Sequence, residues 1–142
     1  MFDTILLPID PHHAESWEKA LPVALHLCGD SGTLHVLGIV HDLGAAASVA
    51  SFLPADFEKS ALQKMGADMD AFVAANVPAG RTAVVHVAYG HVPQRILSAA
   101  EEIGAGLIVM ASQPPDELVT LLVGSNAGRV VRHARQSVLV VR

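Results

Sequence analysis

The chain has 142 residues and a formal net charge of −5, and 51% of its residues are hydrophobic while only 4% are aromatic. The core must therefore be built from Val, Leu, Ile and Ala, a composition typical of a buried parallel sheet flanked by helices. The negative charge argues against sequence-independent binding to nucleic acid or anionic lipid, and no apolar run approaches the ~18 residues of a membrane span. We therefore expect one domain, residues 1–142, with neither nucleic acid nor membrane as a partner.

Cysteine usage and the N-terminal residues both point to the cytoplasm. Cys28 is the only cysteine, so an intramolecular disulfide cannot form, which fits a reducing compartment. The first residues show neither the basic region nor the cleavage pattern of a signal peptide. Cys28 itself falls on an apolar stripe, and we expect it to be a small buried hydrophobic side chain.

Apolar periodicity divides the chain into alternating strands and helices. The strands are expected at 4–9, 34–40, 82–88, 107–110 and 138–141, with Tyr89-Gly90 as a turn after the third. The first three helices are expected from Trp17 to Cys28, from about 56 to 77 and from Val92 to Ile103, and the apolar stripe of the fourth comprises Val123, Ala127, Val130, Val131 and Ala134. Strands separated by helices require a parallel sheet covered on both faces, so the predicted class is a doubly wound α/β fold.

In such a fold, ligands bind outside the carboxyl ends of the strands, where the strand order reverses. The loops at that edge begin at Asp10, at Val40, at Tyr89 and at Ser112. The last strand, Val138–Val141, has no helix after it, and an uncovered apolar edge strand invites pairing with another chain. We therefore expect a second copy to cover it and to form a two-fold homodimer.

The polar loop between the fourth strand and the fourth helix is the best candidate for a ligand site. It runs from Ser112 to Asn126, and Gly124-Ser125-Asn126 lies at the expected helix start. A helix start presents unpaired N–H groups and the positive end of the helix dipole, which bind anions. We expect this loop to hold the phosphates of a nucleotide. The alternatives are that these three residues form only a turn and cap, and that Asp10 only caps the first helix.

Several stretches resemble the universal stress protein family. They are Asp-Thr-Ile-Leu-Leu-Pro-Ile-Asp at 3–10, Gly-His-Val-Pro at 90–93, Gly-Ser-Asn at 124–126, Val-Val-Arg-His-Ala at 130–134 and Ser-Val-Leu-Val-Val-Arg at 137–142. The similarity runs the length of the chain. It implies a five-stranded sheet of order 3-2-1-4-5, a dimer paired through the last strands, and a stress-response protein that often binds ATP.

The resemblance also implies which residues line the nucleotide site. Those expected at the base and ribose are Pro8, Ile9, Asp10 and Val40, the last through its backbone. Those expected at the ribose and first phosphate are Met110, Ala111, Ser112 and Gln113. Those expected at the outer phosphates are Gly124, Ser125 and Asn126, with Ser137 and Val138 beside them. A carboxylate can accept hydrogen bonds from ribose hydroxyls, glycine allows close backbone approach, and Mg²⁺ can accompany ATP through phosphate oxygens.

The loop departs from the common ATP-binding pattern of the family, which is glycine, two residues, glycine, nine residues, glycine and then Ser or Thr. The first two glycines are absent, and no Lys or Arg lies between 113 and 123. The loop is more similar to a subclass reading Ala-Ser-His-Arg-Pro-Asp before Leu-Leu-Gly-Ser-Asn-Ala, with Gln113 in place of the histidine and Pro114 in place of the arginine. A lost charged contact to phosphate costs about 1.5–3 kcal/mol, so a nucleotide-free dimeric scaffold is the alternative function.

The remaining polar residues give weaker signals. His12-His13 beside Asp10 is the best metal candidate, but no third ligand is placed by spacing, so we expect no metal site. His35 and His86 are expected to be ordinary strand side chains, and Arg129, Arg132 and Arg135 to form a solvated helix face. The sequence has neither a G-x-S-x-G nucleophile frame nor a Walker A lysine. A binding protein with an unknown client is therefore favoured over an enzyme, and slow ATP hydrolysis or autophosphorylation is a weaker alternative.

Overall fold

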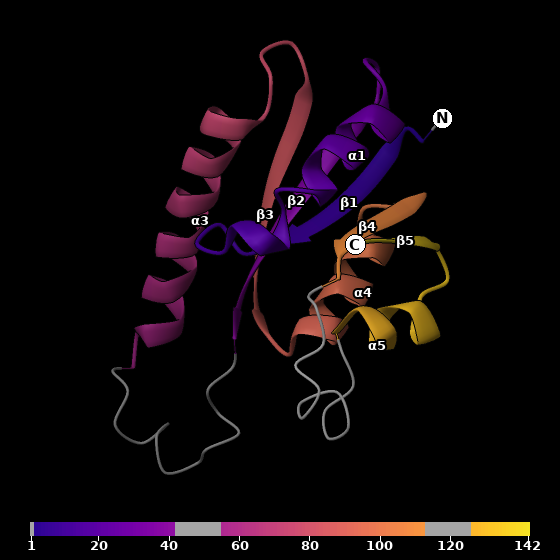
Figure 1. The fold of residues 1–142 in the computed structure, drawn as a ribbon. Helices are drawn as coiled ribbons and strands as arrows, with labels where there is room; N and C mark the ends of the chain where they lie inside the picture. Colours follow the sequence, from indigo (N-terminus) through magenta and orange to yellow (C-terminus); the bar gives the residue numbers. More distant parts are fainter. Residues whose placement is uncertain (1, 42–54, 113–125) are drawn as a thin grey trace.

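The structure, a computed structural model, describes residues 2–41, 55–112 and 126–142, and its elements alternate as the apolar pattern predicts (Figure 1). The strands are β1 (Thr4–Ile9), β2 (Thr33–His41), β3 (Thr82–Gly90), β4 (Leu107–Ala111) and β5 (Ser137–Val141). The helices are α1 (Ala20–Cys28), α3 (Phe57–Asn76), α4 (Val92–Glu102) and α5 (Asn126–His133), and a short 3-10 turn, η1 (Ala14–Ser16), precedes α1.

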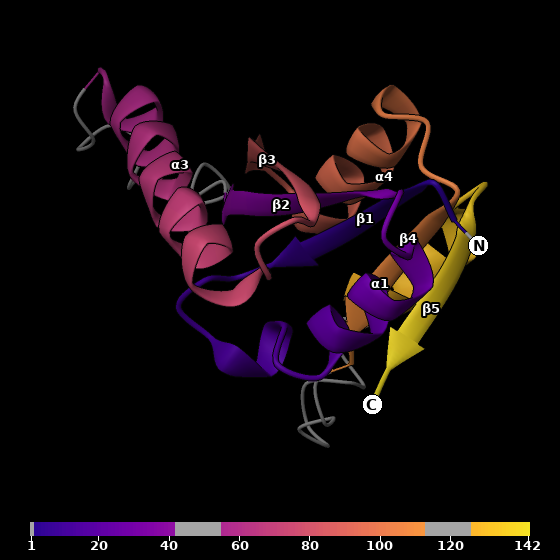
Figure 2. The ribbon, with the colours of Figure 1, turned by 90° about the horizontal axis from the view of Figure 1, so that it is seen from above.

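The strands form one parallel five-stranded sheet in the order β3-β2-β1-β4-β5. This confirms the predicted doubly wound α/β fold and the strand order that the family resemblance implies. Figure 2 shows β3 at one edge of the twisted sheet and β5 at the other. The strand order reverses between β1 and β4, so the switch point lies between these two strands.

Two apolar clusters, one on each face of the sheet, form the core. Odd-numbered residues of β1 such as Ile5 and Leu7 pack with α1 and α3, whereas Leu6 packs with α4 and α5. This alternation follows from the two-residue period of a strand. Both faces of β1 and β4 are thus covered, which explains why these strands are continuous runs of apolar residues.

The first helix begins later than its apolar stripe suggests. Trp17 and the two residues after it form turns rather than helix, and α1 starts at Ala20. Pro22 explains the difference, because proline has no N–H to donate and is tolerated only in the first turn of a helix. The helix ends as predicted at Gly29, whose φ of 66° is in the left-handed region that favours glycine.

Two further expectations need correction. Tyr89-Gly90 is not a turn after β3, because β3 continues to Gly90, which pairs with His41 of β2. Val131 does not face the core: it is 53% exposed, whereas its neighbour Val130 is fully buried. Adjacent residues on a helix point about 100° apart, so only one of the two valines can face the sheet.

Among the described residues, no helix is both long enough and apolar enough to cross a membrane. Val123, at the expected start of the fourth helix, and residues 42–54 of the expected mobile connection lie outside the described residues.

Candidate functional site

The switch point of the sheet is also the place where two neighbouring strands separate. β1 pairs with β4 only at Ile5–Leu107 and Leu6–Ile108, although the strands continue to Ile9 and Ala111. On its other side, β1 stays paired with β2 as far as Ile9. The carboxyl ends of β1 and β4 therefore part from each other, and the residues that follow them, Asp10 and Ser112, begin the loops on either side of the gap.

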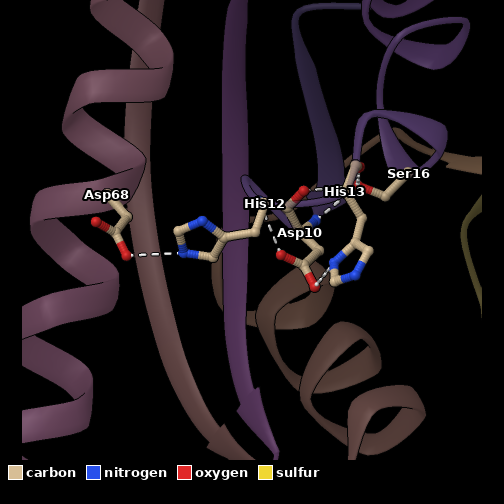
Figure 3. A network of polar contacts seen from close by, with 5 residues as sticks. All are labelled: Asp10, His12, His13, Ser16 and Asp68. Atoms are coloured by element: carbon tan, nitrogen blue, oxygen red, sulfur yellow. Dashed lines mark hydrogen bonds and ion pairs between the residues drawn. The ribbon is translucent and has the colours of Figure 1, made fainter.

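Asp10 is held in place by the turn that follows β1 (Figure 3). Its backbone N–H donates to Ser16 Oγ at 2.8 Å, and the Ser16 hydroxyl lies 2.9 Å from the Asp10 carbonyl oxygen. Its carboxylate accepts from the His12 backbone N–H at 3.0 Å and from His13 Nδ1 at 2.8 Å. These contacts fix the direction of the carboxylate before any ligand arrives.

The Asp10 carboxylate nevertheless keeps room for a ligand. Its side chain is 48% exposed, and each oxygen has one described partner but two lone pairs. Asp10 does not cap α1, since the residue before that helix is Lys19, with no side-chain hydrogen bond to the helix. The carboxylate instead closes a turn through its bond to the His12 N–H, two residues along the chain.

The same turn is tied to α3 by a second histidine. His12 Nε2 lies 2.9 Å from Asp68 Oδ2, which also accepts from Lys64 Nζ at 3.0 Å. The hydrogen bond from Lys64, with smaller contributions from His12, lowers the pKa of the Asp68 carboxyl. Figure 3 shows His12 and His13 pointing in different directions, His12 toward α3 and His13 toward Asp10.

The different directions of the His12 and His13 side chains bear on whether the two could bind one metal ion. Because their rings face different carboxylates, the adjacent histidines do not converge on one point. Among the described residues, no group of three His, Cys, Asp or Glu side chains is placed to hold a metal ion.

The other predicted residues near β1 and β2 lie at the same edge of the sheet. Pro8 is half-buried, and Ile9 is buried in the cluster with α1 and α3, so Ile9 can offer a ligand only its backbone. β1 ends at Ile9, which lies opposite Gly38 of β2. Val40 is two residues further along β2, where it pairs with Tyr89 of β3. Its backbone therefore lies at the carboxyl edge, where the adenine contact was expected.

On the other side of the gap, the residues at the end of β4 differ in their burial. The Met110 side chain is buried against α4 and α5, whereas Ala111 and Ser112 are half-buried. The Ser112 N–H donates to the Val141 carbonyl oxygen at 2.8 Å. Asn126 is exposed at the first position of α5, while Gln113, Gly124 and Ser125 lie outside the described residues.

Ser137 and Val138 are not brought to this edge. They pair with Leu107 and Ile108, at the amino end of β4, while Ala111 pairs with Val141. At about 3.3 Å per residue, Ser137 lies roughly 13 Å from the carboxyl edge. Their expected place beside the outer phosphates is therefore corrected: in a parallel pair, the start of β5 must lie next to the start of β4.

The sequence profile of the universal stress protein family matches residues 1–142. The chain belongs to this family.

The relatives agree with this assignment. The chain is 33% identical to Universal stress protein G of Escherichia coli O157:H7 over 145 residues, an alignment that covers the whole of both. Among solved structures, it resembles the universal stress protein UspA from Lactobacillus plantarum with a TM-score of 0.64 and 24% identity, covering 98% and 97% of the two chains. It also resembles a universal stress protein in complex with cAMP, with a TM-score of 0.65, 16% identity, and 99% and 97% coverage. At these identities, the structural likenesses show the fold alone.

Sequence reasoning missed several contacts of this universal stress protein, and three of them involve the histidines that the sequence had singled out. They are the His13–Asp10 pair, the His12–Asp68 pair and a contact between His35 and His86 on neighbouring strands. The first could have been found from the sequence, because a histidine three residues after a strand-ending aspartate can reach back to it. The other two join residues more than 50 positions apart, and periodicity alone does not reveal them.

Proposed function

We propose that this chain is a stress-response protein that binds ATP, or another adenine nucleotide, between the carboxyl ends of β1 and β4, and that it acts in the cytoplasm as a homodimer paired through β5. The observation that carries the proposal is the early end of the pairing between β1 and β4 at Leu6 and Ile108. A gap at the switch point is where doubly wound folds bind nucleotides. The cAMP complex of the relative supports the choice of an adenine nucleotide.

In this proposal each part of the site has one task. Asp10 accepts hydrogen bonds from the ribose hydroxyls, and the Val40 backbone meets the adenine edge. Pro8 and the Ile9 backbone also lie at the base and ribose, and residues 110–113 line the ribose and first phosphate. Gly124, Ser125 and Asn126 offer backbone N–H groups to the outer phosphates, which can bring Mg²⁺ with them.

The experiment is isothermal titration of the purified protein with ATP, ADP, AMP and cAMP. We expect Asp10→Ala to weaken binding about tenfold or more, because a hydrogen bond to a charged group contributes about 1.5–3 kcal/mol. Gly124→Val should weaken the binding of ATP more than that of AMP, since it obstructs the outer phosphates and leaves the base site intact. The side chains of Asp10 and its partner His13 are 48% and 66% exposed, so we expect the Asp10 variant to fold.

Asp3→Ala is the matched control. Asp3 precedes β1 at the opposite end of the same strand and is exposed, so its loss changes the net charge equally without touching the site. The proposal fails if the Asp10 and Gly124 variants both titrate like the unaltered protein. It also fails if the Asp3 variant loses as much affinity as the Asp10 variant, since the effect would then be one of overall charge.

The second candidate function is a nucleotide-free dimeric scaffold that binds a client protein. It is favoured by the absence of any Lys or Arg between 113 and 123, where cations near phosphate would be expected. Mass spectrometry of small molecules released from denatured protein, purified without added nucleotide, separates the two. An empty protein that also fails to bind added nucleotide supports the scaffold. A phosphate-release assay tests the weaker alternative of slow ATP hydrolysis, and a flat time course would exclude it.

A further inference from the structure

A hollow lies between α4 and α5, and its described lining includes neither Asp10 nor Ser112. Its volume is about 300 Å³, and its apolar lining comes from Pro93 and Leu97 of α4. The α5 side consists of Arg129, Arg132 and His133. These three positions follow the three- and four-residue spacing of one helix face, so α5 presents a row of nitrogen donors to α4.

The charge in this hollow is of one sign. Among the described residues, the lining contains no carboxylate, and no carboxylate lies within 4 Å of the Arg129 or Arg132 guanidinium. Arg135 behaves differently, because it follows the end of α5, lies outside the hollow and contacts Glu101 at 3.8 Å. In a chain of net charge −5, two arginines with no ion-pair partner among the described carboxylates are unusual. The predicted arginine face is exposed at all three positions, but Arg135 lies after the end of α5, so only Arg129 and Arg132 belong to the helix.

His91 extends the donor row onto the start of α4. Arg129 Nη1 donates to His91 Nε2 at 3.1 Å. A guanidinium can only donate hydrogen bonds, so the His91 Nε2 accepts and the ring proton sits on Nδ1. The positive end of the α4 dipole lies at the same place, since His91 is the residue before that helix. All these groups favour an anion.

We propose that the groove between α4 and α5 is a binding site for a small phosphate-bearing anion, separate from the nucleotide crevice. Phosphate fits better than a carboxylate because it carries more charge and offers three or more acceptor oxygens to several donors at once. An arginine guanidinium can donate two parallel hydrogen bonds to two of those oxygens. Two arginines one helical turn apart can therefore bind two adjacent phosphates. The apolar floor formed by Pro93 and Leu97 leaves room for the organic part of such a compound.

This proposal rests on the groove alone and does not depend on the proposed nucleotide crevice. The two sites nevertheless share a helix, because α5 begins at Asn126 and carries Arg129 one turn later. An anion in the groove would therefore contact the helix whose first turn is assigned to the outer phosphates of the nucleotide.

The test is titration of the full chain with inorganic pyrophosphate in 150 mM NaCl, followed by calorimetry and by amide chemical shifts. We expect saturable binding, with the shifts concentrated at Gln94, Leu97 and Arg129. In the Arg129→Gln/Arg132→Gln double variant, the affinity should fall at least tenfold. Both side chains are exposed, and thermal unfolding will show whether the variant folds. If the variant does not fold, the proposal is judged by whether the chemical shifts of the unaltered protein change in the groove.

Two control variants distinguish binding in the groove from a general charge effect and from binding in the nucleotide crevice. Arg135→Gln removes one positive charge just after α5 and outside the groove, and it should change the affinity less than twofold, whereas Arg129→Gln alone should weaken binding more. Gly124→Val is designed to obstruct the outer phosphates in the nucleotide crevice and should leave pyrophosphate binding unchanged even if it weakens ATP binding. The proposal is overturned by the absence of binding at millimolar pyrophosphate, by equal losses in the Arg135 variant, or by shifts confined to the loops after β1 and β4.

Discussion

The imidazole rings of His35 and His86 meet across β2 and β3, with His35 Nδ1 2.7 Å from His86 Nε2. The rings are stacked, with centroids 5.0 Å apart and planes inclined by 20°. The pair is diagonal in the sheet, since His35 lies opposite Val84 and His86 opposite Leu37. One ring must donate and the other accept, so the contact requires at least one of the two histidines to be neutral.

This pair predicts a loss of stability in mild acid. Burial, and to a smaller extent the neighbouring His86, lowers the pKa of His35 below its ordinary value of 6.5. The unfolded chain therefore takes up the His35 proton at a higher pH than the native protein does. The free energy of unfolding should fall as the pH drops below 6.5 toward the native pKa of His35, where the loss becomes complete.

Urea denaturation between pH 7.5 and pH 4.5 measures this loss. His35→Gln should flatten the pH dependence, and at pH 7.5 it should cost about 0.5–1.5 kcal/mol through the lost hydrogen bond. His26→Gln, at an exposed position on α1, is the control and should keep the slope of the unaltered protein. An unchanged slope in the His35 variant would show that other groups govern the acid response.

A second prediction concerns the close approach of β2 to α3. A Cβ atom at Gly38 would lie 2.9 Å from Met65 Sδ and from Met69 Cγ and Sδ. Met69 is fully buried, so its side chain has little room to yield. We expect Gly38→Ala to lower the free energy of unfolding by about 1–3 kcal/mol, the usual cost of overpacking.

Gly66→Ala on the facing helix is the matched comparison for Gly38→Ala. A Cβ at Gly66 meets nothing within 4 Å, and Gly66 lies inside α3. The substitution should therefore stabilise the protein by roughly 0.5–1 kcal/mol through helix propensity. Thermal or urea unfolding of the two variants gives the comparison, and a destabilised Gly66 variant would contradict the described packing of α3.

Arg81 gives a third prediction, because it ties the end of α1 to the start of β3. Its Nη2 donates to the carbonyl oxygens of Leu25 and Gly29, each at 2.5 Å. The last carbonyls of a helix have no partners within the helix. Arg81→Met keeps most of the side-chain volume but removes the donors, and we expect it to cost about 1–3 kcal/mol.

Urea denaturation also tests the Arg81 prediction. Arg95→Met, at an exposed position on α4, removes the same charge without touching α1 and should change the stability by less than about 0.5 kcal/mol. Equal effects of the two substitutions would mean that charge, not the contact with α1, is responsible.

The fourth prediction concerns the reactivity of Cys28. Its side chain is 4% exposed, and burial raises the pKa of the thiol, although nearby Arg81 partly opposes the shift. Burial and the raised pKa both suppress reaction of the thiolate. Labelling by a thiol reagent at pH 8 should be slower in native protein than in urea, on the order of a thousandfold or more if access requires unfolding. Complete labelling of native protein within seconds would contradict the buried position.

The fold could be predicted from the sequence because its strongest signals are local. Apolar runs such as 107–110 are too short for helices and too apolar for exposed strands, and Gly29 and Pro78 end helices by their own conformational limits. The strand order was not in those signals; it came from the family resemblance. Periodicity also could not choose between Val130 and Val131, since either valine continues a three- or four-residue spacing.

The candidate site was predicted in part. The loops at Asp10 and Ser112 follow from the rule that strand ends meet at one edge, which requires only the positions of the strands. The position of Ser137 and Val138 depends also on how β5 pairs with β4, which the strand positions alone do not reveal. Without that register, these two residues were assigned to the wrong end of the sheet. The groove between α4 and α5 was missed for a similar reason, because His91 and Arg129 become neighbours only when the helices pack.

The hydrogen bond from the Ser112 N–H to the Val141 carbonyl oxygen fastens the first residue of the β4–α5 loop to the outermost strand. A second chain that paired with β5 would therefore lie one strand away from Ser112. A displacement of β5 would reach the end of β4 through this single main-chain contact.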